Sequence, residues 1–174
     1  MSNRKMSKYI TEQMFLYSQT AIAKHIKNVF ASVAQFNVGC LFCQKILDPV
    51  GDFYFPKKYA MSSGLRGKEL NEDVGGDPKS DHCINKIEIE GAAGDGNVQG
   101  VDPKQFFNDI FTGKIKQPNG KPLNEIIDQC IYEERHTFRG VERWVHLGRR
   151  KVPRREFLYS LDGKTYHTAT KPLT

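Results

Sequence analysis

The first part of the chain carries apolar residues at helical spacing and lacks both of the residue types that most often break helices. No glycine or proline lies between Ser7 and Ala34. The recurring apolar residues are Met14, Ile22, Ile26, Val29, Phe30 and Val33. This period predicts one long amphipathic helix, or two joined helices, packed on the core. We therefore expect an N-terminal helical segment over 7–36.

The middle of the chain, 37–120, alternates short apolar runs with glycine-rich stretches. An aromatic run at 53–55 predicts a short strand. Residues 62–80 combine glycines and charges with little apolar periodicity, which predicts a long loop. Long loops often carry function, so this loop is expected to lead into a site.

Two further elements are predicted in this middle region. Isoleucines alternate with charged residues over 84–90, which indicates a strand, and 91–96 then has the composition of a glycine-rich turn. Asp102 and Pro103 are typical of a helix start, and Gly113 is typical of a helix end. We expect a helix between them with an apolar stripe of phenylalanines and isoleucine.

The last segment, 121–174, is predicted to begin with a helix and to finish in strands. Apolar residues at helical spacing indicate a helix over about 123–134. Three later runs have the aromatic and β-branched content of strands: 143–147, 157–161 and 164–168. Asp162-Gly163 separates the last two runs and predicts a tight hairpin.

Together these elements predict an α+β fold: N-terminal helices, a central strand-loop-helix unit and a C-terminal antiparallel sheet with a tight hairpin. The 174 residues are 39% hydrophobic, which is enough for one core at this length. We expect a single domain over 1–174. Its parts are the helical segment 7–36, a site region 37–120, and a helix with basic strands over 121–174.

The chain is basic, and the excess of positive charge is uneven. Its formal net charge is +6 at pH 7, and many Lys and Arg residues lie between positions 135 and 155. Such a cluster predicts contact with a polyanion, so nucleic acid is the expected partner. The side chains expected to hold its backbone are Arg149, Arg150, Arg154 and Arg155.

The four cysteines do not have the pattern of a secreted disulfide framework, because the chain start has no signal-like apolar run. No apolar stretch approaches the roughly 20 residues that a membrane helix needs. These features predict a cytoplasmic protein without a membrane partner.

Asp81 and His82 are followed by Asn97, Asn108 and Lys114, with a glycine-rich stretch between the histidine and the first asparagine. This stretch, 81–114, resembles the motif of HNH nucleases of the His-Me finger superfamily. The resemblance implies that a divalent metal, magnesium or manganese, is held by Asp81 and Asn108. It also implies that His82 deprotonates water, that Asn97 orients His82, and that Lys114 contacts phosphate. Histidine suits the role of base because its ordinary pKa lies near neutrality.

Cys40 and Cys43 have the two-residue spacing that lets both thiolates reach one tetrahedral zinc ion. Completing a structural zinc site would take two of Cys83, Cys130 and His136. The alternatives are that both are buried free thiols or a redox pair. A thiol nucleophile at Cys40, with a later histidine as its partner, is a further hypothesis.

Two other functions compete with a metal-dependent endonuclease. A set of acidic and imidazole side chains near the C-terminus, with the arginine cluster, resembles the residues of barnase-like ribonucleases, which cleave RNA without metal. These side chains are Glu133, Glu134, Glu142, His146 and His167. A basic arm with aromatic residues also suits a protein that binds nucleic acid without any reaction. The same arm suits a subunit of a phage, viral or secretion assembly. Protein partners such as an inhibitor or other assembly subunits fit these settings.

Overall fold

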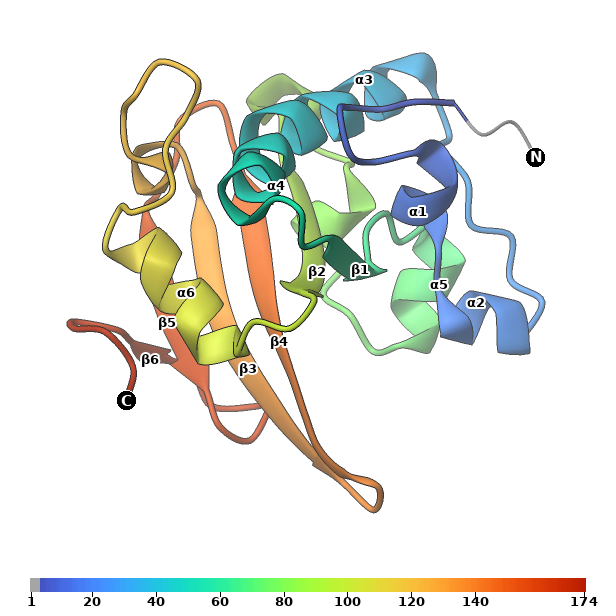
Figure 1. Ribbon diagram of the computed structural model, residues 1–174. Coiled ribbons are helices and arrows are strands. Elements are labelled where there is room, and N and C mark those ends of the chain that lie inside the picture. The colour runs from blue at the N-terminus through green and yellow to red at the C-terminus, as the bar shows by residue number, and fades with distance from the viewer. Residues whose placement is uncertain (1–3) are drawn as a thin grey trace.

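The computed structural model describes residues 4–174 and has the α+β fold that the sequence predicts. Six strands form one sheet in the order β1-β2-β4-β3-β5-β6 (Figure 1). Their bounds are β1 Tyr59–Ser63, β2 Ala92–Val98, β3 Gln129–Thr137, β4 Gly140–Arg149, β5 Glu156–Ser160 and β6 His167–Thr168. Neighbouring strands are antiparallel except β3 and β5, which are parallel. The sheet is therefore mixed, and the C-terminal antiparallel sheet predicted from the sequence is found except at this one parallel pairing.

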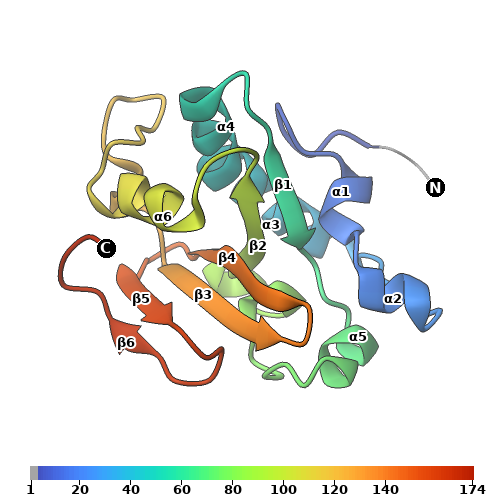
Figure 2. The same ribbon diagram turned by 60° about the horizontal axis from the view of Figure 1, so that its bottom comes forward.

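The larger helices lie against one face of the sheet, while the N-terminal helices and α5 gather near its β1 end (Figures 1 and 2). The α-helices are α1 Glu12–Leu16, α2 Gln19–Ala23, α3 Val33–Phe42, α4 Asp48–Tyr54, α5 Lys68–Asp73 and α6 Pro103–Phe111. A π-helical segment, η1 Cys43–Leu47, joins α3 to α4 without a break. Short 3-10 turns are η2 Asp81–Cys83, η3 Ile87–Ile89 and η4 Leu123–Glu125.

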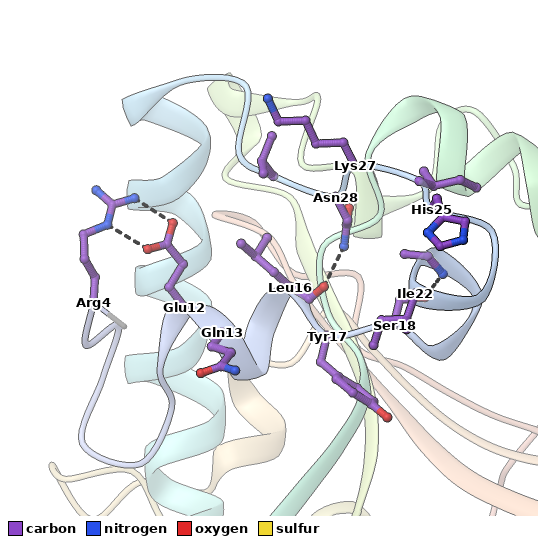
Figure 3. Close-up of a pocket in the computed structure, with 13 residues that line it drawn as sticks. Arg4, Glu12, Gln13, Leu16, Tyr17, Ser18, Ile22, His25, Lys27 and Asn28 are labelled. Carbon is purple, nitrogen blue, oxygen red and sulfur yellow. Dashed lines mark hydrogen bonds and ion pairs between the residues drawn. The ribbon is translucent and has the colours of Figure 1, made fainter. Parts of the chain in front are cut away.

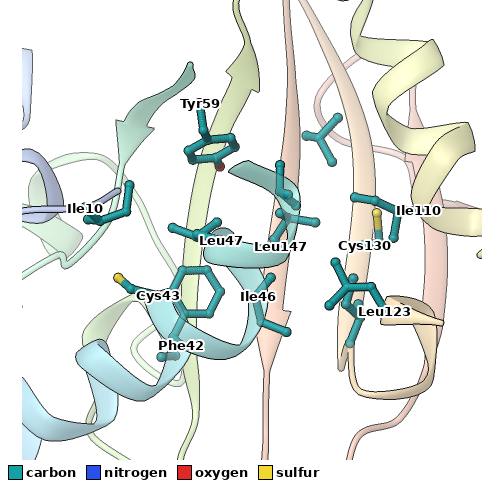
Figure 4. Close-up of a cluster of buried hydrophobic side chains, with 14 of the residues drawn as sticks. Ile10, Phe42, Cys43, Ile46, Leu47, Tyr59, Ile110, Leu123, Cys130 and Leu147 are labelled. Atoms are coloured by element: carbon teal, nitrogen blue, oxygen red, sulfur yellow. The ribbon is translucent and has the colours of Figure 1, made fainter. Parts of the chain in front are cut away.

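The core lies between the sheet and the layer formed by α3, η1, α4 and α6 (Figure 4). Cys130 of β3 is paired with Leu147 of β4, and Tyr132 with Val145, and all four side chains are fully buried. Because side chains alternate along a strand, the residues between them point to the opposite face of the sheet. We call that opposite surface the site face; its residues are Asp95, Ile131, Glu133, Trp144 and His146.

The prediction of one long helix, or two joined helices, over 7–36 is wrong in its extent. α1 and α2 are five residues each, and α3 begins only at Val33. The hydroxyls of Thr11, Ser18 and Ser32 each accept a backbone N–H at the start of a helix. Hydroxyl side chains offer the backbone such local hydrogen bonds, so helices begin and end here without glycine or proline.

Two predictions in the middle region are also wrong. The aromatic run 53–55 lies at the end of α4, where Phe53 packs edge-on against Tyr54. The predicted loop 62–80 contains the end of β1 and α5. In both places, packing against the rest of the protein outweighs local strand propensity or glycine content.

The strand predicted over 84–90 and the turn predicted over 91–96 are exchanged in the structure. Ile84 and Glu90 have left-handed backbone conformations on either side of a 3-10 turn, whereas β2 contains the glycines. A Cβ at Gly94 would lie 3.2 Å from the Phe42 ring, and one at Gly96 would lie 2.5 Å from the Ala60 carbonyl oxygen. These glycines serve close packing on the core face of a strand and do not form a turn.

The helix predicted over 123–134 is wrong beyond its first turn, because η4 ends at Glu125 and β3 begins at Gln129. Cys130 faces the core and Ile131 is buried on the other side of the sheet. A strand buried on both faces produces an apolar run that a helical period also fits. The connection between β5 and β6 spans 161–166, so it is longer than the two-residue turn predicted at Asp162-Gly163.

The helix predicted after Asp102 is confirmed. The Asp102 carboxylate accepts the backbone N–H groups of Lys104 and Gln105, and Pro103 takes the first helical position of α6. Gly113 follows the helix with a φ of 70°, a conformation that favours glycine. Across residues 4–174, the structure contains no helix with both the length and the apolar character that a membrane span requires.

Candidate metal centre on the sheet

Three side chains from distant parts of the chain converge beside the sheet: His82 of η2, Asp95 of β2 and His146 of β4. Asp95 Oδ1 lies 3.2 Å from His82 Nε2 and 2.8 Å from His146 Nδ1. The two imidazole nitrogens are 3.3 Å apart. Within the described range 4–174, this is the one group of three or more His, Cys, Asp or Glu side chains whose ligand atoms all lie within 4.8 Å of one another. We call it the triad.

The pairing of β2 with β4 fixes the positions of two triad residues. Asp95 and His146 are directly opposite each other in the antiparallel register of β2 and β4. Directly opposed residues have Cβ atoms roughly 5 Å apart and on the same face. Gly94 and Gly96 flank Asp95 toward the core, and Val145 and Leu147 flank His146 in the same way. This alternation turns both polar side chains to the site face.

His82 reaches the triad from a short turn that is held at both ends. The Ser80 hydroxyl accepts the His82 backbone N–H, and the turn ends at Ile84 in a left-handed conformation. His82 Nδ1 lies 2.7 Å from the Gly64 carbonyl oxygen. A carbonyl oxygen only accepts, so Nδ1 carries the proton and donates it. His82 Nε2 therefore presents a lone pair to the triad.

Gly64 is required for this arrangement because the chain approaches it closely. A Cβ at Gly64 would lie 2.3 Å from the Phe15 carbonyl oxygen, so any other residue displaces the backbone. We expect Gly64→Ala to weaken metal binding about 10- to 100-fold, as the loss of a ligand's supporting hydrogen bond does elsewhere. Isothermal titration with zinc or manganese measures the change.

Gly148→Ala is the matched control, since its Cβ would meet its nearest neighbour at an ordinary 3.5 Å. This variant should bind metal like the wild type. Wild-type affinity in the folded Gly64→Ala variant would show that the Gly64 carbonyl does not orient His82.

The electrostatics of the triad favour a bound cation. Burial lowers the pKa of His82, and the attraction of Asp95 only partly opposes this. Burial alone would raise the pKa of Asp95, but the facing imidazoles of His82 and His146 lower it overall. When His82 is neutral, its Nε2 lone pair faces the Asp95 carboxylate. A lone pair and a carboxylate oxygen 3.2 Å apart repel each other unless a cation or a proton lies near both.

The donor set matches known metal chemistry. Imidazole nitrogens with one carboxylate suit zinc, manganese and iron, whereas magnesium prefers oxygen ligands. A metal-binding histidine usually donates its other ring N–H to a carbonyl or carboxylate, as His82 does to Gly64. Three protein ligands leave coordination positions for water and substrate, which is the pattern of catalytic sites.

Two more charged groups lie beside the triad. Arg66 Nη2 is 3.6 Å from Asp95 Oδ2, and the buried Arg66 Nε has no hydrogen-bond partner. Glu133 Oε2 accepts a hydrogen bond of 3.1 Å from the Tyr166 hydroxyl. Burial and then the charge of Asp95 raise the pKa of Glu133. The site face thus carries a guanidinium with an unused donor and a carboxyl group whose protonation is favoured.

Of the residues predicted from the HNH resemblance, His82 alone belongs to the triad. Asp81, next to it, points away: its carboxylate binds Arg150 Nε at 2.8 Å and Lys86 Nζ at 3.3 Å. Successive residues of a 3-10 turn point about 120° apart, so this pair cannot aim at one ion. Asp81 instead ties η2 to the end of β4.

The other motif residues do not belong to the triad either. Asn97 lies on β2 two residues after Asp95, and its amide donates to the Arg143 carbonyl oxygen. Asn108 of α6 holds the C-terminal segment by exchanging two hydrogen bonds with Leu173. Lys114 pairs with Asp109 at 2.7 Å. The structure therefore does not bring Asp81, Asn97 and Asn108 together around one ion.

The arginines expected to hold a nucleic-acid backbone are engaged within the protein. Arg149 pairs with Glu90 at 2.7 Å, and Arg155 Nε donates to the Glu125 carbonyl oxygen. Arg154 binds Asp128 through several hydrogen bonds, the shortest 2.6 Å long. Much of the basic cluster thus supports the fold.

Asp128 anchors a network that supports the turn carrying His82. Its carboxylate is fully buried, binds Arg154, and lies 3.5 Å from Arg150, which in turn binds Asp81. Burial alone would raise the pKa of Asp128, but the hydrogen bonds from Arg154 lower it overall. A carboxyl with a lowered folded-state pKa stabilises the fold above its unfolded pKa of about 3.9. That contribution is lost as the pH falls through the folded-state value.

We expect Asp128→Asn to lower the free energy of unfolding by about 2 kcal/mol at neutral pH, because Arg154 and Arg150 lose the buried anion that they contact. Urea unfolding measures this. The difference from wild type should shrink as the pH falls below about 4. The exposed pair of Asp73 with Lys24 provides the control, and Asp73→Asn should cost less than about 1 kcal/mol. If the difference in unfolding free energy between wild type and Asp128→Asn did not depend on pH, the ionised Asp128 carboxylate would not be its source.

Cys40 and Cys43 lie on the helix formed by α3 and η1, and neither belongs to a group of three ligands within residues 4–174. Cys43 is fully buried in the core, and burial raises its pKa well above the usual value. Cys83 and Cys130, the other two cysteines, also have free thiols. A zinc site at Cys40 and Cys43 thus stays a prediction from spacing.

A hollow of about 890 Å³ lies away from the triad, along α1, α2 and the segment that follows (Figure 3). Its wall includes the ion pair of Arg4 with Glu12, and Asn28 donating to the Leu16 carbonyl oxygen. Both interactions hold the N-terminal segment together. The hollow contains no triad residue, so we locate the candidate chemistry on the site face instead.

Sequence reasoning missed Asp95 and assigned His146 only to the metal-free alternative. Asp95 lies within the glycine-rich stretch interpreted as a turn. Its signal was the alternation of small and polar residues from Gly94 to Asn97, which fits a strand with one closely packed face.

No protein-family model, curated protein or solved structure matches this chain. Its function is therefore inferred from the chemistry of the site. The features that carry this inference are the three converging ligand atoms and the Arg66 guanidinium beside them.

Proposed function

We propose that this protein is a metal-dependent phosphodiesterase acting on nucleic acid, with His82, Asp95 and His146 as the metal ligands. The observation that carries the proposal is the convergence of two imidazole nitrogens and one carboxylate oxygen within 4.8 Å beside the sheet. The side chains of Asp95 and His146 are 14% and 13% exposed, so solvent reaches the triad. The proposal changes the role of His82 from general base to metal ligand.

A cation at the triad would supply Lewis-acid chemistry, offsetting charge on the phosphate and lowering the pKa of bound water. The protein's own groups supply the rest. Arg66 offers a planar fork of donors, which matches phosphate oxygens. Glu133, whose pKa is raised, is suited to hold or release a proton. The nitrogen-rich ligand set favours zinc or manganese over the magnesium also expected from the motif.

The substrate class is supported by charge and composition. The net charge of +6 attracts polyanions and speeds their encounter with the protein. We also propose a cytoplasmic setting, which the four free thiols support because such thiols persist in reducing compartments.

One observation favours a second candidate, a metal-free ribonuclease. Glu133 and His146 lie diagonally across neighbouring strands β3 and β4 on the site face. A carboxyl group and an imidazole in such positions are able to act as the base and acid of RNA cleavage. In this hypothesis, Arg66 stabilises the charge on the phosphate.

The deciding experiment is cleavage of supercoiled plasmid and of total RNA, with zinc, manganese or magnesium and with excess EDTA. The proposal predicts cleavage that EDTA abolishes and that is lost in Asp95→Asn. RNA cleavage that persists in EDTA and is lost in Glu133→Gln would favour the metal-free ribonuclease instead. No cleavage in any buffer would overturn both, and the site face would then be a binding or assembly surface.

A further inference from the structure

Trp144 is the only tryptophan of the chain, and it lies on the site face close to the triad. It precedes His146 by two residues on β4, so both side chains point to the same side of the sheet. At about 3.4 Å per residue, the two positions are roughly 7 Å apart along the strand. The ring is half-buried and so keeps an exposed part.

Two charged residues of β3 lie next to the indole. Trp144 is directly opposite Glu133 in the register of β3 and β4. The Arg135 guanidinium lies over the ring, 5.7 Å from its centre, and forms an exposed ion pair with Glu142 at 2.5 Å. A half-buried aromatic ring is a suitable surface for stacking a planar base.

Two polar atoms near the triad have unused hydrogen-bonding capacity. Arg66 Nε, on the guanidinium beside Asp95, has no partner, and neither has Asn97 Oδ1 on β2. Asn97 is the next position along β2 from Gly96, which is opposite Val145, so it neighbours Trp144. Buried polar atoms without partners are rare in folded proteins and often indicate a missing water, ion or ligand.

The exposed ring and the unpaired polar atoms together indicate which class of nucleic acid the site binds. This inference rests on the proposed function. We propose that the site takes single-stranded nucleic acid, with a phosphate bound by Arg66 beside the triad and the adjoining base stacked on Trp144. In a duplex the bases are stacked on one another and their faces are unavailable to a side chain on a sheet. A single strand exposes those faces, and stacking on aromatic side chains is how sequence-tolerant binding arises.

Tryptophan fluorescence tests this directly, because Trp144 is the single tryptophan and excitation at the long-wavelength edge of its absorption leaves the tyrosines largely unexcited. Wild-type protein in EDTA, where the proposed cleavage does not proceed, is titrated with a short single-stranded RNA, the matching single-stranded DNA, their duplex forms and inorganic phosphate. We expect saturable quenching by the single strands, with at least about 10-fold weaker binding of the duplexes, and no quenching by phosphate. The two single strands separate RNA from DNA as the preferred ligand.

Substitutions at Trp144 test whether its ring contributes to the affinity for single strands. Trp144→Ala should weaken binding of a labelled single strand about 5- to 150-fold, the range expected for one stacked base. Trp144→Phe, which keeps an aromatic ring, should recover part of the affinity. Phe138→Ala, at the 94% exposed tip of the β3–β4 hairpin, should leave the affinity unchanged.

Equal quenching by duplex and single strand, binding without quenching, or no binding at all would overturn the inference. The binding assay needs neither metal nor turnover, so its failure is distinct from failure of the proposed function. Metal-dependent cleavage without quenching leaves the proposed function intact and refutes the stacking site. Quenching without any cleavage supports the stacking site and refutes the phosphodiesterase.

Discussion

Replacing His146 with alanine is expected to reduce metal affinity by more than about 100-fold and to abolish metal-dependent cleavage. Loss of a supporting residue around a metal typically costs 10- to 100-fold, and loss of a ligand should cost more. His146 Nδ1 lies 2.8 Å from Asp95 Oδ1 and completes the triad from β4. Isothermal titration and the plasmid assay measure the two effects.

Asp81→Asn is the matched control, because Asp81 belongs to the HNH resemblance but not to the triad. Its carboxylate binds Arg150 and Lys86, so the variant should lose some stability and keep most of its metal affinity. If Asp81→Asn lost the metal and His146→Ala retained it, the motif assignment would be correct and the triad would not be the metal centre.

Replacing Phe42 with alanine is expected to lower the free energy of unfolding by about 4 kcal/mol, a large part of the stability of a typical domain. Phe42 is fully buried, and its ring centre lies 6.1 Å from that of Phe15. The ring also lies over the backbone of β2 at Gly94. Its removal leaves a cavity where the α3 helix meets the strand that carries Asp95. Urea unfolding followed by circular dichroism measures the loss.

Phe138→Ala removes the same ring from a 94% exposed position and should change stability by less than about 0.5 kcal/mol. Equal losses in the two variants would contradict the placement of the core. A folded Phe42→Ala variant should also bind metal more weakly, since β2 loses its support beneath Asp95.

The sequence predicted the elements whose signals are local. Asp102, Pro103 and Gly113 define α6 through capping and backbone preference, which neighbours in sequence decide. The same holds for β4 and β5, whose aromatic and β-branched residues have strand propensity. The α+β class follows from these elements.

The predictions from the sequence are wrong where contacts between distant residues determine the local structure. Gly94 and Gly96 have the composition of a turn, but Phe42 and the Ala60 carbonyl require small residues on a strand there. Ile84 to Glu90 alternates like a strand, yet two left-handed residues bend it into turns. Asp95 lies in the stretch that the sequence predicts to be a turn, so the sequence does not indicate that it pairs with His146. His82 was identified, but its partners come from strands 13 and 64 residues away.

The most direct test of the metal centre is anomalous X-ray diffraction from crystals grown with manganese or zinc. We predict one anomalous peak about 2.0–2.3 Å from His82 Nε2, Asp95 Oδ1 and His146 Nδ1. A peak coordinated by Asp81 and Asn108, or the absence of any peak between the three triad atoms, would contradict the account.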